Sequence, residues 1–168
     1  MTAAEQTLAE QVFRQRIMFV RAGKIAEGLA DLLGSGLPAG PLARAALHEA
    51  GHFAIGRHLG LPVTEAGIGF QDGSVCGYVS LGADESPDDG KSPSDEEISS
   101  NLMALLNDLE RPADVAALDD QVRGILYDHW AEVRHVAWVL HDLSACGRSI
   151  RLSVAQIERA CRILEGSC

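Results

Sequence analysis

The segment from Pro41 to Gly60, PLARAALHEAGHFAIGRHLG, constrains the fold of this chain more than any other. Proline favours the first position of a helix and glycine commonly follows the last, so these two residues predict one helix between them. Within it, His48 and His52 are four residues apart, which places both imidazoles on the same helix face. Their neighbours are largely apolar, and an imidazole without a partner would be costly there.

The same residues predict a metal site, because His48, Glu49 and His52 form an HExxH motif. Histidines on successive turns can each direct a nitrogen to a zinc ion about 2.0–2.1 Å away. Glu49 is offset to the side, where it can reach a zinc-bound water. Zinc lowers the pKa of that water to near 7, so a carboxylate can take its proton during attack on a carbonyl and pass it to the leaving amine. We therefore predict a Zn²⁺-dependent metallopeptidase, with His48 and His52 as ligands and Glu49 as the general base.

The stretch ALHEAGHFAIGRHLGLPVTEAGI resembles the peptidase domain of the FtsH-type ATP-dependent zinc metalloproteases, in particular small stand-alone relatives that lack the ATPase. LYDHWAEVRHVAWVL, further along, is similar to a helix of those relatives. The resemblance is specific over about residues 43–81 and loose beyond them. It implies a helical, zincin-like metallopeptidase domain with one zinc, a peptide or protein substrate, and a distant aspartate as third ligand. A further hypothesis is that a separate ATPase or adaptor delivers the substrate.

Two aspartates are candidates for that third ligand. The family pattern has an aspartate near the start of a later helix, followed by apolar residues. Asp114 fits this pattern best, because it comes soon after Pro112 and precedes an apolar stripe. Asp108 is the second candidate, because NDLER is similar to the family's sequence around its aspartate. Pro112 would, however, interrupt a helix that continued past Asp108. This chain departs from the family in the stretch LMALLNDLE, where the family has small residues. The alternative to a ligand role is that both aspartates are ordinary charges near a helix N-terminus.

His58 is the competing candidate, since it stands six residues after His52, as in the metzincin pattern HExxHxxGxxH. That pattern needs a glycine at the position of Ile55, whereas the glycine here is Gly56. If the helix continues, His58 lies about 600° of rotation beyond His52 and points away from the metal. We therefore interpret His58 as a solvent-facing histidine near a helix end.

The remaining pattern predicts a single domain, 1–168, that is mainly α with one small β-hairpin. Residues 3–33 have helical periodicity, with Gly23 as a potential break, and belong to an N-terminal helical segment, 1–40. The zinc-peptidase-like core is then 41–168.

Turn and loop signals divide that core. Two β-leaning runs flank Asp72-Gly73, which predicts the hairpin. Residues 82–95 are acidic and rich in proline, glycine and serine, which predicts a flexible loop. Helix resumes at about residue 95, restarts after Pro112, and continues as one apolar stripe to about residue 145. Ser153 and Gln156 predict a capping box for a last helix.

Composition excludes several functional classes. The chain has 168 residues, of which 46% are hydrophobic, so it can bury a core. The net charge of −10 argues against nucleic acid and anionic membranes as partners. No apolar run reaches the roughly 18 residues that a membrane span needs, and the first residues lack a signal peptide's apolar stretch. We expect a cytoplasmic protein; its oligomeric state, substrate and cleavage preference stay open.

The alternative hypothesis is a non-catalytic metal-binding or protein-interaction domain derived from the same fold. A structural zinc site does not need Glu49, so the intact HExxH motif favours catalysis. Structural zinc is also usually closed by four protein ligands. Counting the ligands therefore helps to separate the two hypotheses.

Overall fold

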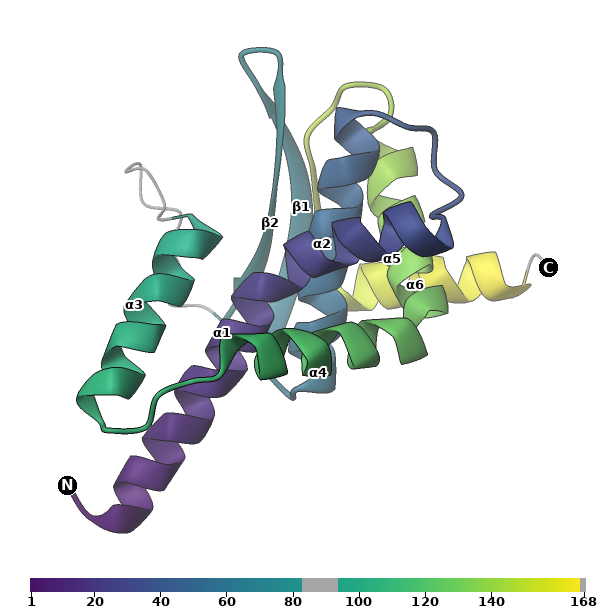
Figure 1. The fold of residues 1–168 in the computed structure, drawn as a ribbon. Coiled ribbons are helices and arrows are strands. Elements are labelled where there is room, and N and C mark those ends of the chain that lie inside the picture. Colours follow the sequence, from purple (N-terminus) through teal and green to yellow (C-terminus); the bar gives the residue numbers. More distant parts are fainter. Residues whose placement is uncertain (83–93, 167–168) are drawn as a thin grey trace.

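A computed structural model describes residues 1–82 and 94–166 (Figure 1). The chain is mainly helical with a small antiparallel sheet, which confirms the predicted class in outline. The elements in chain order are α1 (Ala3–Leu33), α2 (Pro41–His58), β1 (Val63–Gln71), β2 (Ser74–Leu81), α3 (Asp95–Asp108), α4 (Val115–Asp128), α5 (Trp130–Ser144), β3 (Ile150–Ser153) and α6 (Val154–Gly166).

Helix α2, which carries the HExxH motif, lies at the centre of the fold. It packs against α1, α5 and both long strands, so nearly all of its second half is buried. Gly51, inside the motif, is required by this packing. A Cβ there would lie 2.6 Å from the Cβ of Ala26 and 2.7 Å from the carbonyl oxygen of Ala22. Glycine therefore allows α1 and α2 to cross at close range.

Helix α1 is continuous, and the predicted break at Gly23 does not occur. A reciprocal capping box between Thr2 and Glu5 begins the helix. Its residues Ile17, Ala22 and Ala26 belong to the same core cluster as those of α2. The second half of helix α1 is thus part of the hydrophobic core.

The predicted hairpin is confirmed and gains a third strand. Strands β1 and β2 pair in antiparallel fashion, and Asp72 and Gly73 connect them with positive φ angles of 50° and 79°, as a type I′ turn requires. Strand β3 pairs with the other side of β1, which gives the order β2-β1-β3. This strand was not predicted, because four residues of mixed polarity are too few for a clear period.

The helical second half also departs from prediction in one place. The stripe after Pro112 is not one helix, because the chain breaks at His129 between α4 and α5. The capping box before α6 is confirmed: Ser153 N donates to Gln156 Oε1 at 2.9 Å, and Gln156 N donates to Ser153 Oγ at 3.2 Å. Most of the predicted loop at 82–95 lies outside the described residues.

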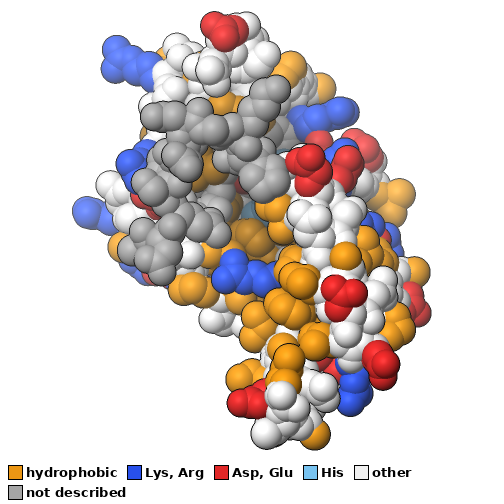
Figure 2. Space-filling model, turned by 90° about the vertical axis from the view of Figure 1, so that its left-hand side faces the viewer, with side chains coloured by type: hydrophobic (Ala, Val, Ile, Leu, Met, Phe, Trp, Pro, Cys, Tyr) orange, Lys and Arg blue, Asp and Glu red, His pale blue; other side chains and the backbone are white. Residues whose placement is uncertain are grey.

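Figure 2 shows the face of the molecule that carries α3, with hydrophobic side chains spread over its lower half. The exposed hydrophobic residues of α1 and α3 include Leu8, Val12 and Leu105. Within the described residues, no helix is both long and apolar enough to cross a membrane.

Candidate metal centre

Three side chains meet at one point: His48 and His52 of α2, and Asp95 of α3. Each Nε2 atom lies 3.1 Å from Oδ2 of Asp95, and the two Nε2 atoms are 3.0 Å apart. Ligand atoms about 2.0–2.2 Å from a tetrahedral zinc are themselves roughly 3.3 Å apart. Two imidazole nitrogens and a carboxylate oxygen at this spacing could therefore hold a metal ion, and zinc is one of the metals that accept such ligands.

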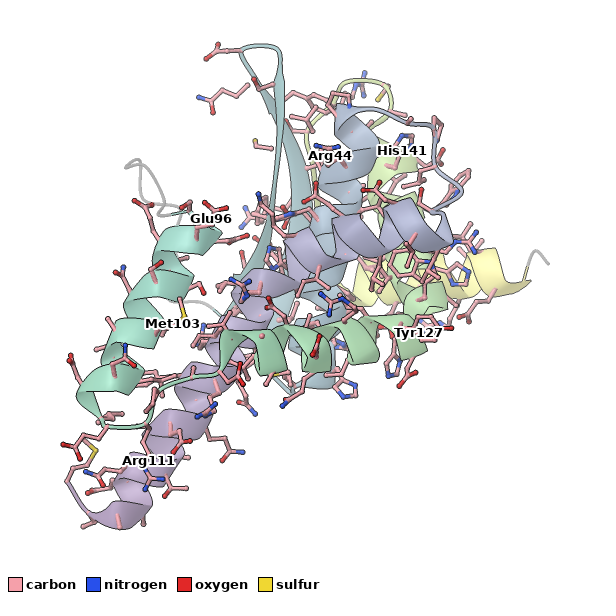
Figure 3. The ribbon with its side chains drawn as sticks, viewed as in Figure 1. Arg44, Glu96, Met103, Arg111, Tyr127 and His141 are labelled. Carbon is pink, nitrogen blue, oxygen red and sulfur yellow. The ribbon has the colours of Figure 1, made fainter. Side chains whose placement is uncertain are left out.

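Asp95 is the residue that the sequence interpretation missed. It is the first residue of α3, directly after the N-cap Ser94, which forms a capping box with Glu97. The neighbouring Glu96, labelled in Figure 3, marks this end of the helix. Acidic residues are ordinary in a first helical turn, so Asp95 did not stand out. The available signal was the S-x-x-E capping box of a helix start, with the apolar residues Leu102 and Leu106 seven and eleven positions after Asp95.

The structure does not bring the two predicted aspartates to the histidines. Asp114 is the N-cap of α4, where its Oδ1 accepts a hydrogen bond from Ala117 N at 3.1 Å. Asp108 is exposed at the opposite end of α3 from Asp95. In the described part of the chain, neither joins a group that could hold a metal ion. His58 is exposed, and its ring lies 5.2 Å from that of His129 at a tilt of 56°; it does not belong to the group at the centre.

Glu49 lies beside this centre and is buried, with 6% of its surface exposed. Strand β2 covers it: a Cβ on Gly77 would lie 2.4 Å from Glu49 Cγ. Burial raises the pKa of Glu49, and the charges of His52 and His48 oppose that rise. A raised pKa brings the carboxyl closer to neutral pH, where a group that takes and returns a proton is most effective.

A backbone acceptor and a side-chain acceptor orient the two histidines through their Nδ1 atoms. His52 Nδ1 donates to the carbonyl oxygen of Phe19 at 2.7 Å, and His48 Nδ1 donates to Glu27 Oε2 at 2.9 Å. When Nδ1 carries the hydrogen, the lone pair of the neutral ring is on Nε2. Both ligand nitrogens are therefore presented to the same point.

Without metal, the polar groups of the centre form a charged network. Burial lowers the pKa of His48, but hydrogen bonds to Asp95 and Glu27 outweigh this effect and raise it to about 9. Burial raises the pKa of Asp95, but its hydrogen bonds to His48 and His52 lower it far more. At neutral pH, His48 is therefore protonated and Asp95 is ionised.

This network predicts a pH dependence of stability for the metal-free protein. The pKa of His48 rises from 6.5 to about 9 on folding, so its contribution is complete below pH 6.5 and is lost as the pH rises through 9. The pKa of Asp95 falls below 3.8, so its contribution is lost only on acidification. We expect the unfolding free energy of chelator-treated protein to fall by roughly 2–3 kcal/mol between pH 6.5 and 9. Urea denaturation at several pH values measures this.

The matched control for that measurement is His48→Gln, in which the fall should be much smaller. Zinc affinity should change in the opposite direction and rise with pH up to about 9, because the metal must displace the proton of His48. Equal pH profiles of the wild type and His48→Gln would contradict the assignment of this charge to His48.

Comparisons of the chain with protein-family models, curated proteins and solved structures gave no match. The function is therefore inferred from the residues of the site and their geometry.

Proposed function

We propose that this protein is a zinc metallopeptidase similar to the FtsH-type peptidase domains, with His48, His52 and Asp95 as metal ligands. One observation supports this most: three ligand atoms converge beside a buried glutamate of the same helix. Within the described residues the metal-binding group has three members, and three protein ligands with an open fourth position are typical of catalytic zinc. The sequence resemblance over residues 43–81 supports the same proposal.

The chemistry is divided between the metal and the chain. Zinc, when bound, supplies a Lewis acid that makes water more acidic and polarises a carbonyl group. Glu49 takes a proton from the attacking water and returns it to the leaving amine. Burial between α2 and β2 limits the movement of its carboxylate and, in the metal-free protein, raises its pKa. Phe19 and Glu27 hold the imidazoles in place.

The sheet provides a place for an extended peptide. Within the described part of the chain, β2 is an edge strand that pairs only with β1. It passes directly over Glu49 at Gly77. A peptide that adds to this edge by β-augmentation would therefore run close to the general base. This arrangement supports an unfolded or extended segment as the substrate.

The second candidate function is a non-catalytic domain, and one observation favours it. Asp95 Oδ2 lies 3.1 Å from Nε2 of both histidines and accepts a hydrogen bond from protonated His48, so these contacts join α3 to α2 without any metal. The cluster could thus serve as a polar clamp between helices. His48 and Asp95 of this cluster are partly exposed, and the buried carboxylate of Glu49 lies beside them. Both features support the catalytic proposal instead, because a polar clamp between helices needs neither of them.

Metal content and proteolysis test the proposal together. The full chain, purified without chelators, should contain about one zinc, as this site type implies, and should cleave an unfolded protein. His52→Ala and Asp95→Ala should lose both properties. Asp114→Ala is the matched control for Asp95→Ala, since it removes a helix-start aspartate outside the centre; it should keep its zinc. Wild-type protein that binds no metal, or Asp95→Ala that keeps it, would overturn the proposed centre.

A further inference from the structure

Helix α1 contacts the candidate centre along a single face. Phe19, Gly23 and Glu27 are spaced four residues apart, so they lie on successive turns of the same side. The carbonyl of Phe19 accepts the hydrogen bond of His52, and Glu27 accepts that of His48. Gly23, between them, leaves room for the His48 ring: a Cβ there would lie 2.5 Å from Nε2. Helix α1 therefore contacts both rings: Phe19 and Glu27 accept the Nδ1 hydrogens, and Gly23 packs beside Nε2 of His48.

We propose that Glu27 is a positioning residue of the metal centre. It accepts the Nδ1 hydrogen of His48, which fixes the orientation of the ring and leaves Nε2 to bind the metal. Carboxylates that hold a ligating histidine in this way also raise its basicity as a ligand. The inference rests on the proposed zinc site and assigns to it a residue outside the HExxH motif.

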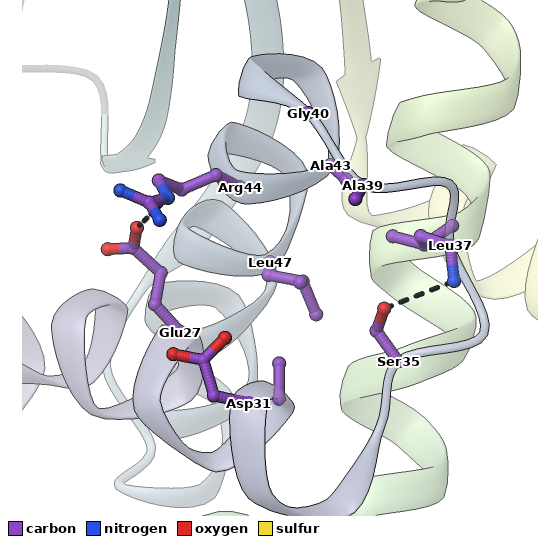
Figure 4. A pocket seen from close by; sticks show the side chains of 10 residues that line it. Glu27, Asp31, Ser35, Leu37, Ala39, Gly40, Ala43, Arg44 and Leu47 are labelled. Carbon is purple, nitrogen blue, oxygen red and sulfur yellow. Dashed lines mark hydrogen bonds and ion pairs between the residues drawn. The ribbon is translucent and has the colours of Figure 1, made fainter.

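The two histidines are supported by different means. His52 is oriented by a backbone carbonyl, which no side-chain substitution removes. His48 depends on the side chain of Glu27, whose exposed fraction is only 22%. The second oxygen of Glu27, Oε1, lies 3.5 Å from Nε of Arg44 (Figure 4). Arg44 is 77% exposed, so this pair contributes little, and the contact with His48 is the dominant one.

The chain offers a matched control. Asp31 lies one turn beyond Glu27 on α1 and lines the same pocket, also shown in Figure 4. It belongs to no hydrogen bond or ion pair of the centre within the described residues. Asp31→Asn therefore removes one negative charge from the same helix and pocket but leaves the support of His48 intact.

Zinc affinity of the full chain, measured by competition with a chromogenic chelator, tests the proposal. Glu27→Ala should weaken binding about 10–100-fold, the usual effect of losing such a partner. Glu27→Asp keeps the charge but withdraws it from Nδ1, so its affinity should fall similarly. Glu27→Gln keeps an acceptor oxygen in place, so its zinc affinity should fall less. The zinc affinity of Asp31→Asn should match that of the wild type. If Glu27→Ala does not fold, Glu27→Asp decides the result.

A spectroscopic readout separates positioning from a general structural role. In the zinc-loaded wild type, ¹⁵N NMR should show an Nδ1 hydrogen of His48 that exchanges slowly with solvent. That signal should be lost in Glu27→Asp and kept in Glu27→Gln. Wild-type zinc affinity in both Glu27→Ala and Glu27→Asp would overturn the role of Glu27 but leave the metal site intact. A wild type without zinc would instead overturn the proposed function and this inference with it.

Discussion

Glu49→Gln should bind zinc as the wild type does and lose peptide hydrolysis, with a rate reduced about 10²–10⁴-fold. The amide occupies the same space but cannot take a proton, and the ligands His48, His52 and Asp95 are unchanged. The variant should also be more stable at neutral pH. The pKa of Glu49 is raised above 4.5 by burial, so its ionised form opposes folding as the pH rises past that value. Removing the charge should raise the unfolding free energy by roughly 0.5–2 kcal/mol.

Zinc content, cleavage of an unfolded protein and urea denaturation measure the three properties of Glu49→Gln. Glu132→Gln is a suitable control, because it neutralises an exposed carboxylate on α5 and should change none of them. Loss of activity that is accompanied by loss of zinc would point to a structural role for Glu49. Full activity in Glu49→Gln would contradict the general-base assignment.

Gly23→Ala should destabilise the protein by about 1–3 kcal/mol, the usual cost of forcing extra volume into a packed site. The new methyl group would lie 2.5–2.6 Å from three atoms of the His48 imidazole. The ring must then leave the position in which its Nε2 meets the other ligand atoms, so zinc affinity should fall about 10–100-fold, as when a supporting contact of a ligand is lost. Circular dichroism and chelator competition measure these two effects.

Gly28→Ala is the matched control, because Gly28 lies on the same helix with nothing within 4 Å of an added Cβ. In an exposed helix interior, alanine should stabilise the fold by up to about 1 kcal/mol without changing zinc affinity. Equal behaviour of the two variants would show that Gly23 is not needed for the position of His48.

Local sequence predicted the parts of this protein that depend on neighbouring residues. The helix that carries HEAGH begins at Pro41 as predicted, and its two histidines meet because residues four apart share a helix face. The hairpin follows from Asp72-Gly73 in the same way. His58 does not belong to the group at the centre, because the helix continues through it.

Contacts between distant segments were beyond such reasoning. The carboxylate beside the histidines belongs to Asp95, 43 residues after His52, and not to Asp114. Both aspartates stand at a helix start, and local pattern cannot tell which start packs against α2. Strand β3 was missed for a similar reason, since its pairing with β1 joins residues that are 82 to 88 positions apart in the chain.

The sequence by itself determined the two histidines and the glutamate of the centre, because helical periodicity is a local property of the chain. Only the tertiary structure decided the third carboxylate, the cover that β2 places over Glu49, and the support that α1 provides. Gly23 illustrates the difference: on its own helix it suggests a break, and it is explained only by the His48 ring from α2 that packs against it. Which helices touch is set by the burial of whole apolar faces, and no single local pattern encodes it.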